Sequence, residues 1–303
     1  MPASPRYLDP KSIERISRLD LRARAVVEGF LTGQHRSPYN GFAIEFAGHR
    51  EYVPGDELKH VDWRVWSKTD RLYIKQYEEE TNLKCHILLD CSRSMRYGEK
   101  SSPPWSKFDY AATAAASLAF LLQQQQDAVG LVTFDTKVRT HLPPSSHPSQ
   151  LKRLLHQLEQ ASPDERTDVS GLFLELAAPL KTRGVVVLVS DLFLDLATLK
   201  DALEKFRLRK HDVIVFHVMH DDELKFPFDD NTQFRGMEID RELQTDPKSL
   251  RRSYLEIVDK YLTDVRKTCG TLGVDHVLLN TAEPLDAALA SYLTLRQKVK
   301  RRH

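Results

Sequence analysis

Short apolar runs alternate with longer amphipathic segments from residue 84 onward. The clearest apolar runs are 84–90 (KCHILLD), 184–190 (GVVVLVS) and 212–219 (DVIVFHVM), and each is nearly continuous rather than alternating. Continuous runs of this length are typical of parallel strands that are covered on both faces. The amphipathic segments between them are long enough to be helices. The pattern predicts an α/β fold with a doubly wound, mostly parallel, Rossmann-like sheet.

The remaining elements of this region follow from the same patterns. Residues 138–142 are predicted to pair with 128–135 as an edge strand. Ser106 and Asp109 have the spacing of a capping box at the start of a largely apolar helix. Residues 221–246 are expected to be a loop with a short hairpin, in which the acidic residues are solvated.

The first 83 residues show a different pattern, in which aromatic, charged and turn-forming residues are interleaved. A helix is predicted over 21–35, and residues 71–80 (RLYIKQYEEE) alternate as a strand does. We therefore expect an N-terminal, β-containing appendage at 1–83 that packs on a main domain at 84–295, followed by a basic tail at 296–303.

Composition sets the broad class of the protein. The chain has 303 residues, of which 41% are hydrophobic, and 44 Lys and Arg balance 43 Asp and Glu. A net charge of +1 gives no global field that favours nucleic acid. No apolar run approaches the ~20 residues that cross a bilayer, and the N-terminus lacks the apolar core of a signal peptide. We expect a cytoplasmic protein without a membrane span, with Cys85, Cys91 and Cys269 unpaired.

Oxygen-bearing side chains follow the first buried strand of the main domain. Asp90 ends this strand, and Ser92 and Ser94 follow at every second position. The carboxyl ends of strands are where open α/β sheets bind ligands, and oxygen-only ligands suit a hard divalent cation such as Mg²⁺. Thr167 and Asp191 lie in two further loops that should converge on the same edge. We expect these five residues to form a metal site.

The ligand types predict what such a site does. The hydroxyls of Ser92, Ser94 and Thr167 are neutral, whereas Asp90 and Asp191 would act through bound waters or hydrogen bonds. A cation with mainly neutral ligands stays a strong Lewis acid, and its vacant position attracts a carboxylate. The expected ligand is therefore an Asp or Glu side chain of a partner protein.

An enzymatic function is the alternative hypothesis. The chain has no GxxxxGK[ST], GxSxG or GxGxxG motif. A phosphatase of the aspartyl-phosphate type needs a second Asp where Ser92 stands, so no catalytic residue is assigned and a metal-dependent phosphohydrolase remains the alternative. Near the site, Asp168 is expected to cap a helix and Ser190 to bond the backbone.

Two motifs carry a family resemblance. The loop 90–95 (DCSRSM), with Thr167 and Asp191, resembles the metal-ion-dependent adhesion site of von Willebrand factor A domains. Residues 50–80, with PGD followed by DW, resemble the signature of the DUF58 family, and residues 52–64 are expected to form a buried network there. The resemblance implies a MoxR-type AAA+ ATPase as partner and an adaptor role in the assembly or maturation of protein complexes.

Overall fold

The computed structural model separates the chain into two compact units. One unit comprises residues 34–82, and the other comprises residues 1–33 and 83–303. The structure describes residues 18–34, 48–51, 66, 72–76, 83–99, 105–163, 180, 183–229, 232–237, 242–285, 288–290, 292 and 294. In the smaller unit, β1 (Gly48–Glu51) pairs antiparallel with β2 (Tyr73–Gln76). Strand β2 lies within residues 71–80, where a strand was expected. The predicted network at 52–64 lies outside the described residues.

The larger unit alternates strands and helices, as the apolar pattern predicts. Its strands are β3 (Lys84–Asp90), β4 (Ala128–Phe134), β5 (Val138–Ser145), β6 (Val185–Ser190), β7 (Asp212–Met219), β8 (Thr232–Arg235), β9 (Glu242–Thr245) and β10 (Asp275–Asn280). Its helices are α2 (Leu19–Gln34), the 3₁₀ turn η3 (Arg93–Arg96), α4 (Lys107–Gln124), α5 (Gln150–Gln160), α7 (Leu196–Leu208), α8 (Asp221–Lys225) and α9 (Pro247–Thr271).

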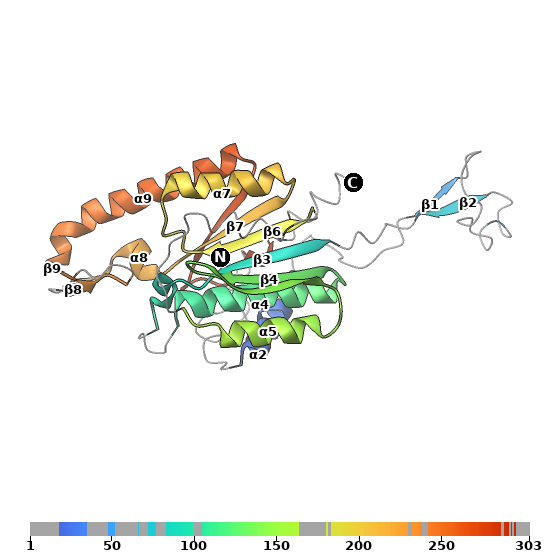
Figure 1. Ribbon diagram of the computed structural model, residues 1–303, viewed down its shortest axis with the longest axis horizontal. Coiled ribbons are helices and arrows are strands. Elements are labelled where there is room, and N and C mark those ends of the chain that lie inside the picture. Colours follow the sequence, from blue (N-terminus) through green and yellow to red (C-terminus); the bar gives the residue numbers. More distant parts are fainter. Residues whose placement is uncertain are drawn as a thin grey trace. The chain divides into compact units, whose positions relative to one another are not determined.

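Six of these strands form one sheet in the order β10-β7-β6-β3-β4-β5. All neighbouring pairs are parallel except β4 and β5, which are antiparallel, so the predicted mostly parallel sheet and its edge strand are confirmed. From β3 the chain runs outward to β4 and β5 and then returns to the other side of β3 as β6 (Figure 1). The strand order therefore reverses between β3 and β6, and this is the point at which such sheets bind ligands.

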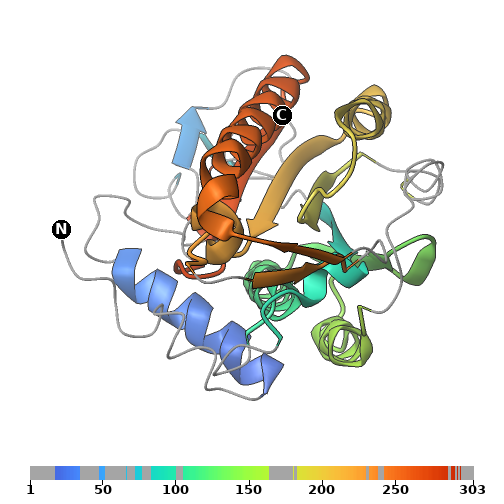
Figure 2. The same cartoon turned by 90° about the vertical axis from the view of Figure 1, so that its left-hand side faces the viewer.

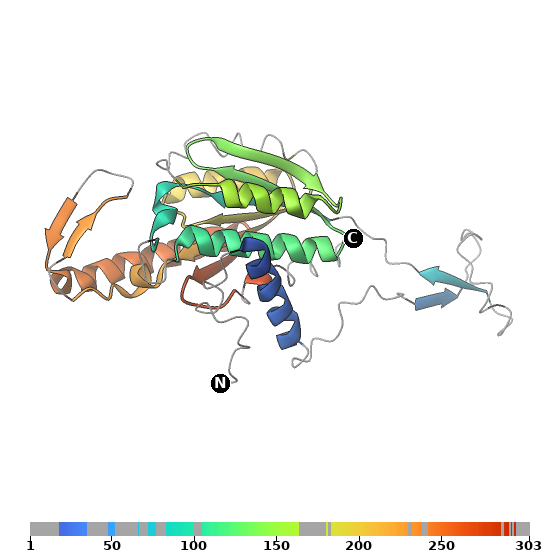
Figure 3. The same cartoon turned by 90° about the horizontal axis from the view of Figure 1, so that it is seen from below.

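Both faces of the sheet are covered. Helices α4 and α5 lie on one face, and α7 and α9 lie on the other (Figures 1 and 2). Along β6 the side chains alternate between the two layers: Val187 joins the core beneath α4, whereas Leu188 joins the core beneath α7. Helix α2 adds Val26 and Val27 to the first core and lies near α4 (Figure 3). Burial on both faces explains why the strands are apolar throughout.

Several local predictions are also borne out. The side chains of Ser106 and Asp109 form the predicted capping box at the start of α4. Strands β8 and β9 form the predicted hairpin (Figure 3). All three cysteines are free and buried. No helix in the described part of the chain is both long and apolar enough to cross a membrane.

Candidate functional site

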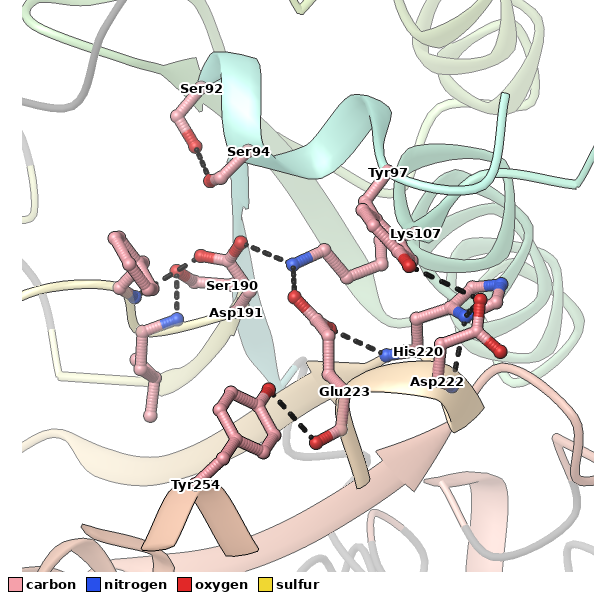
Figure 4. Close-up of polar contacts among 12 residues, drawn as sticks. Ser92, Ser94, Tyr97, Lys107, Ser190, Asp191, His220, Asp222, Glu223 and Tyr254 are labelled. Carbon is pink, nitrogen blue, oxygen red and sulfur yellow. Dashed lines mark hydrogen bonds and ion pairs between the residues drawn. The ribbon is translucent and has the colours of Figure 1, made fainter. Parts of the chain in front are cut away.

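The loop after β3 folds back on its own carboxylate. Asp90 ends the strand, and its Oδ1 accepts a hydrogen bond of 2.8 Å from the backbone N–H of Ser92. The turn η3 then brings the hydroxyls of Ser92 and Ser94 to 3.0 Å from one another (Figure 4). Both serines are buried, with Ser92 at 0% and Ser94 at 7% exposure. The every-second-position spacing thus places two hydroxyls side by side.

The loop after β6 is tied to the same carboxylate. The Ser190 hydroxyl donates a hydrogen bond of 2.5 Å to Asp90 Oδ2 and accepts one of 2.9 Å from the backbone N–H of Leu192. The predicted backbone bond of Ser190 is confirmed, and the bond to Asp90 adds a link between β3 and β6. Leu192 has a φ of 53°, so the chain turns sharply directly after Asp191. The ends of the two strands are therefore joined at the point where the strand order reverses.

A buried lysine, which the sequence analysis did not identify, pairs with Asp191. The ammonium group of Lys107 lies 2.8 Å from Asp191 Oδ2 and 2.8 Å from Glu223 Oε1 (Figure 4). Its side chain is only 2% exposed. Lys107 is the first residue of α4, where the helix dipole disfavours a positive charge. A lysine at this end of a mostly apolar helix was the one signal in the sequence that it is paired with acids elsewhere.

Glu223 links this ion cluster to the short helix α8. Its other oxygen, Oε2, accepts a hydrogen bond of 2.8 Å from the backbone N–H of His220 and so caps α8. The prediction that the acidic residues at the start of 221–246 form a solvated loop is wrong. Asp221 and Asp222 form the first turn of α8, where the helix dipole favours negative charge, and Asp222 accepts a hydrogen bond of 3.2 Å from the Tyr97 hydroxyl.

The two carboxylates at the strand ends have opposite electrostatic environments. Burial, and then the negative charge of Asp191, raise the pKa of Asp90 to about 7. Burial also opposes ionisation of Asp191, but the charge of Lys107 and the hydrogen bonds from Lys107 and Ser94 hold its pKa below the ordinary value. The one ammonium group is shared between Asp191 and Glu223. The cluster therefore keeps an excess of negative charge, which a cation would balance.

The described oxygen atoms fit a hard divalent cation. Mg²⁺ holds oxygen ligands at about 2.0–2.1 Å with octahedral angles, which places neighbouring ligands about 3 Å apart. The Ser92 and Ser94 hydroxyls have this separation, 3.0 Å, which is also that of the hydrogen bond they form with each other. Within the described residues no three His, Cys, Asp or Glu side chains are grouped to hold a metal ion, so hydroxyls would have to supply part of the coordination.

The structure brings four of the five predicted ligands to one edge of the sheet: Asp90, Ser92, Ser94 and Asp191. Thr167, and the helix cap predicted at Asp168, lie outside the described residues. The four described residues come from two loops that are separated by about a hundred positions in the chain and joined by Ser190.

Two histidine pairs, with three members buried and His276 half-buried, are a second feature that could not be found from the sequence. His217 in β7 and His276 in β10 are within hydrogen-bonding distance, 3.3 Å, and His86 packs edge-on against His211. Burial is the main cause that lowers the pKa of His217 to about 3 and that of His86 to about 4. Scattered positions in the sequence gave no sign of these pairs, since each forms only when the strands align.

Comparison with known proteins gives a family but not an activity. The family model described as a protein of unknown function, DUF58, matches residues 48–261. The uncharacterized protein Rv1480 of Mycobacterium tuberculosis is 25% identical over 295 residues, which cover 96% of this chain and 91% of that protein. The conserved hypothetical protein BatB from Bacteroides thetaiotaomicron aligns with a TM-score of 0.49 and 18% identity, covering 72% of this chain and 99% of that one. The PilB minor pilin of Streptococcus sanguinis aligns with a TM-score of 0.43 and 12% identity, covering 77% of this chain and 64% of that one.

Proposed function

This chain belongs to the DUF58 family, and on that premise we propose that it is a non-catalytic, metal-dependent protein-binding module. Its proposed site is centred on Mg²⁺ and resembles the metal-ion-dependent adhesion site of von Willebrand factor A domains. The partner would supply an Asp or Glu carboxylate. The observation that carries the proposal is the convergence of oxygen atoms from Asp90, Ser92, Ser94 and Asp191 where the strand order reverses.

The proposed roles follow from what each side chain already contacts. Ser92 and Ser94 present neighbouring hydroxyls, and Thr167 is proposed as the third hydroxyl ligand. Asp90 orients the loop through the Ser92 backbone and the Ser190 hydroxyl. Asp191 supplies negative charge close to these hydroxyls. When bound, the cation would act as a Lewis acid that accepts a carboxylate oxygen from another molecule.

The oxygen set favours binding over catalysis. A phosphohydrolase would need a general acid and a nucleophile with access to substrate, whereas Asp90 has both oxygens engaged in hydrogen bonds and is 1% exposed. The Lys107 ammonium is likewise engaged with two carboxylates. These groups are arranged to hold a loop in place, which is what a binding site for a cation requires.

The resemblance to the DUF58 family supplies the proposed working partner and location. We propose that the protein acts in the cytoplasm with a MoxR-type AAA+ ATPase, as an adaptor in the assembly or maturation of protein complexes. In that arrangement the ATPase performs the energy-consuming step, and this chain recognises a carboxylate on the ATPase or on its client.

A binding assay with a purified MoxR-type ATPase from the same organism tests the proposal. The full chain should bind the immobilised ATPase or its complex with a client in Mg²⁺ and should dissociate in EDTA. Asp191→Asn should remove Mg²⁺-dependent binding. Asp135→Asn is the matched control, because Asp135 is an equally buried carboxylate after the neighbouring strand β4, where it pairs with Arg139 instead.

An assay with p-nitrophenyl phosphate separates the enzyme from the binding module. The proposal expects no Mg²⁺-dependent turnover. Turnover that is lost in Asp90→Ala would instead establish the phosphohydrolase and overturn the proposal.

A further inference from the structure

A largely apolar pocket opens directly beside the candidate site. It has a volume of about 490 Å³, and Lys107 and Asp191 form part of its wall. Residues of α9, among them Tyr254, Ile257 and Tyr261, form another part of the wall. Because Asp191 belongs to both, any molecule that is bound through the candidate site lies next to this pocket.

Most of the polar groups that line the pocket are already bonded within the protein, and His217 Nε2 is an exception. The Tyr254 hydroxyl donates to the Glu223 backbone carbonyl, and the Tyr261 hydroxyl donates to the backbone carbonyls of Leu192 and Leu194. The Lys107 ammonium is held by two carboxylates. The pocket therefore offers apolar surface, and it has few free groups for a polar or charged ligand.

Two large apolar side chains of the pocket are exposed to solvent. Phe193 is 68% exposed and Ile257 is 69% exposed, and they are two of the five exposed large hydrophobic residues in the described part of the chain. Phe193 lies two residues after Asp191, and its backbone N–H donates to Asp191 Oδ1 at 3.2 Å. Exposed apolar surface that adjoins a pocket is typical of an interaction site.

We propose that this pocket receives a large apolar side chain from the same protein segment whose carboxylate the candidate site binds. The inference rests on the proposed function and specifies the partner: an Asp or Glu followed within two residues by Phe or Leu. An extended chain spans about 3.3–3.6 Å per residue. A side chain that follows the bound carboxylate by one or two residues can therefore reach Phe193, which lies two residues after Asp191 in this chain.

The carboxylate and the apolar side chain of the partner segment depend differently on the cation. The cluster of Lys107, Asp191 and Glu223 has an excess of negative charge, which repels an acidic segment unless a cation is present. The apolar side chain adds affinity that is independent of the cation, because its transfer out of water does not involve charge. Metal-dependent and metal-independent contributions can therefore be measured separately.

Fluorescence anisotropy with labelled model peptides tests this inference. The probes are Gly-Glu-Phe-Gly-Gly and Gly-Glu-Gly-Phe-Gly, with controls in which Phe is replaced by Ala or Glu is replaced by Gln. In Mg²⁺, the better Glu/Phe peptide should bind about tenfold more tightly than its Ala control, the ratio expected for partial burial of one aromatic ring. Phe193→Asn with Ile257→Asn should abolish that preference. Leu208→Asn is the matched control, since Leu208 is an 82% exposed apolar residue on α7 that does not line the pocket.

The possible failures are distinguishable. Mg²⁺-dependent binding of Glu peptides without any preference for Phe would overturn the pocket and leave the proposed function intact. Binding of the Glu/Phe peptide that is equally tight in Mg²⁺ and in EDTA, and no tighter than binding of its Gln control, would overturn the proposed function and the paired recognition together. Loss of the Phe preference in Leu208→Asn, or its survival in the pocket variant, would also contradict the assignment.

Discussion

Replacing Lys107 by Met tests the buried ion cluster that organises the candidate site. In the wild type, one ammonium group pairs at 2.8 Å with both Asp191 and Glu223. The Asp191 side chain is 3% exposed and that of Glu223 is 24% exposed, so the loss of the lysine leaves Asp191 with little access to water. Removal of one partner from a buried ion pair costs about 3–5 kcal/mol, and we expect the free energy of unfolding to fall by that amount.

Urea unfolding followed by circular dichroism in EDTA measures the loss. Lys225→Met is the matched control, because Lys225 is a 66% exposed lysine that also pairs with an aspartate at 2.8 Å. Such exposed pairs contribute little to stability, because water and salt screen them. Addition of Mg²⁺ should restore part of the stability of Lys107→Met, since a bound cation gives Asp191 a new counter-charge. A loss in Lys107→Met no larger than that of the control would refute the role of the cluster.

Two further predictions concern the fold. In Gly184→Ala the new Cβ would lie 2.3 Å from the Lys84 backbone carbonyl oxygen, so we expect the free energy of unfolding in urea to fall by about 1–3 kcal/mol. Gly270→Ala is the control and should not destabilise the protein, because its new Cβ has no neighbour within 4 Å. Equal effects of the two substitutions would contradict the close approach of β3 and β6. The pKa of about 3 for His217 lies below its unfolded value of about 6.5, so the unfolded state binds more protons and stability is lost as the pH falls from about 6.5 toward 3. Asp90 has a raised pKa and therefore affects stability in the opposite direction. The difference in free energy of unfolding between wild type and His217→Gln should isolate the contribution of His217, with a slope of up to about 1.4 kcal/mol per pH unit between pH 4 and 6. Parallel curves of stability against pH for the two proteins would show that His217 is solvated.

Much of the fold could be predicted from the sequence because local patterns determine it. A strand that is buried on both faces must be apolar at nearly every position. Strand β6 meets that requirement from Val185 to Val189, and β7 meets it from Val213 to Val218 except at His217. The capping box of Ser106 and Asp109 and the positive φ of Gly273 after α9 are equally local. The short helix α8 was missed because its five residues are too few to show a helical period.

Some residues of the candidate site could likewise be predicted from local sequence patterns, whereas others depend on contacts between distant parts of the chain. Asp90, Ser92 and Ser94 are close in sequence, and Asp191 follows a strand, so their positions at the sheet edge follow from the α/β pattern. The pairing of Lys107 with Glu223 could not be predicted, because the two residues are 116 positions apart and the sequence does not indicate which opposite charge each of them contacts. The His217–His276 pair likewise depends on the relative register of β7 and β10.

Isothermal titration calorimetry with Mg²⁺ tests the central claim most directly. We expect the wild-type chain to bind one Mg²⁺ and the Ser92→Ala/Ser94→Ala variant to lose that binding, while its circular dichroism spectrum stays native. Ser117→Ala is the control, because Ser117 is a buried serine of α4 whose hydroxyl bonds only the helix backbone of Thr113. Saturable binding in the wild type and the control, but not in the double variant, is the predicted result. No binding in the wild type, or equal affinity in all three proteins, would contradict it.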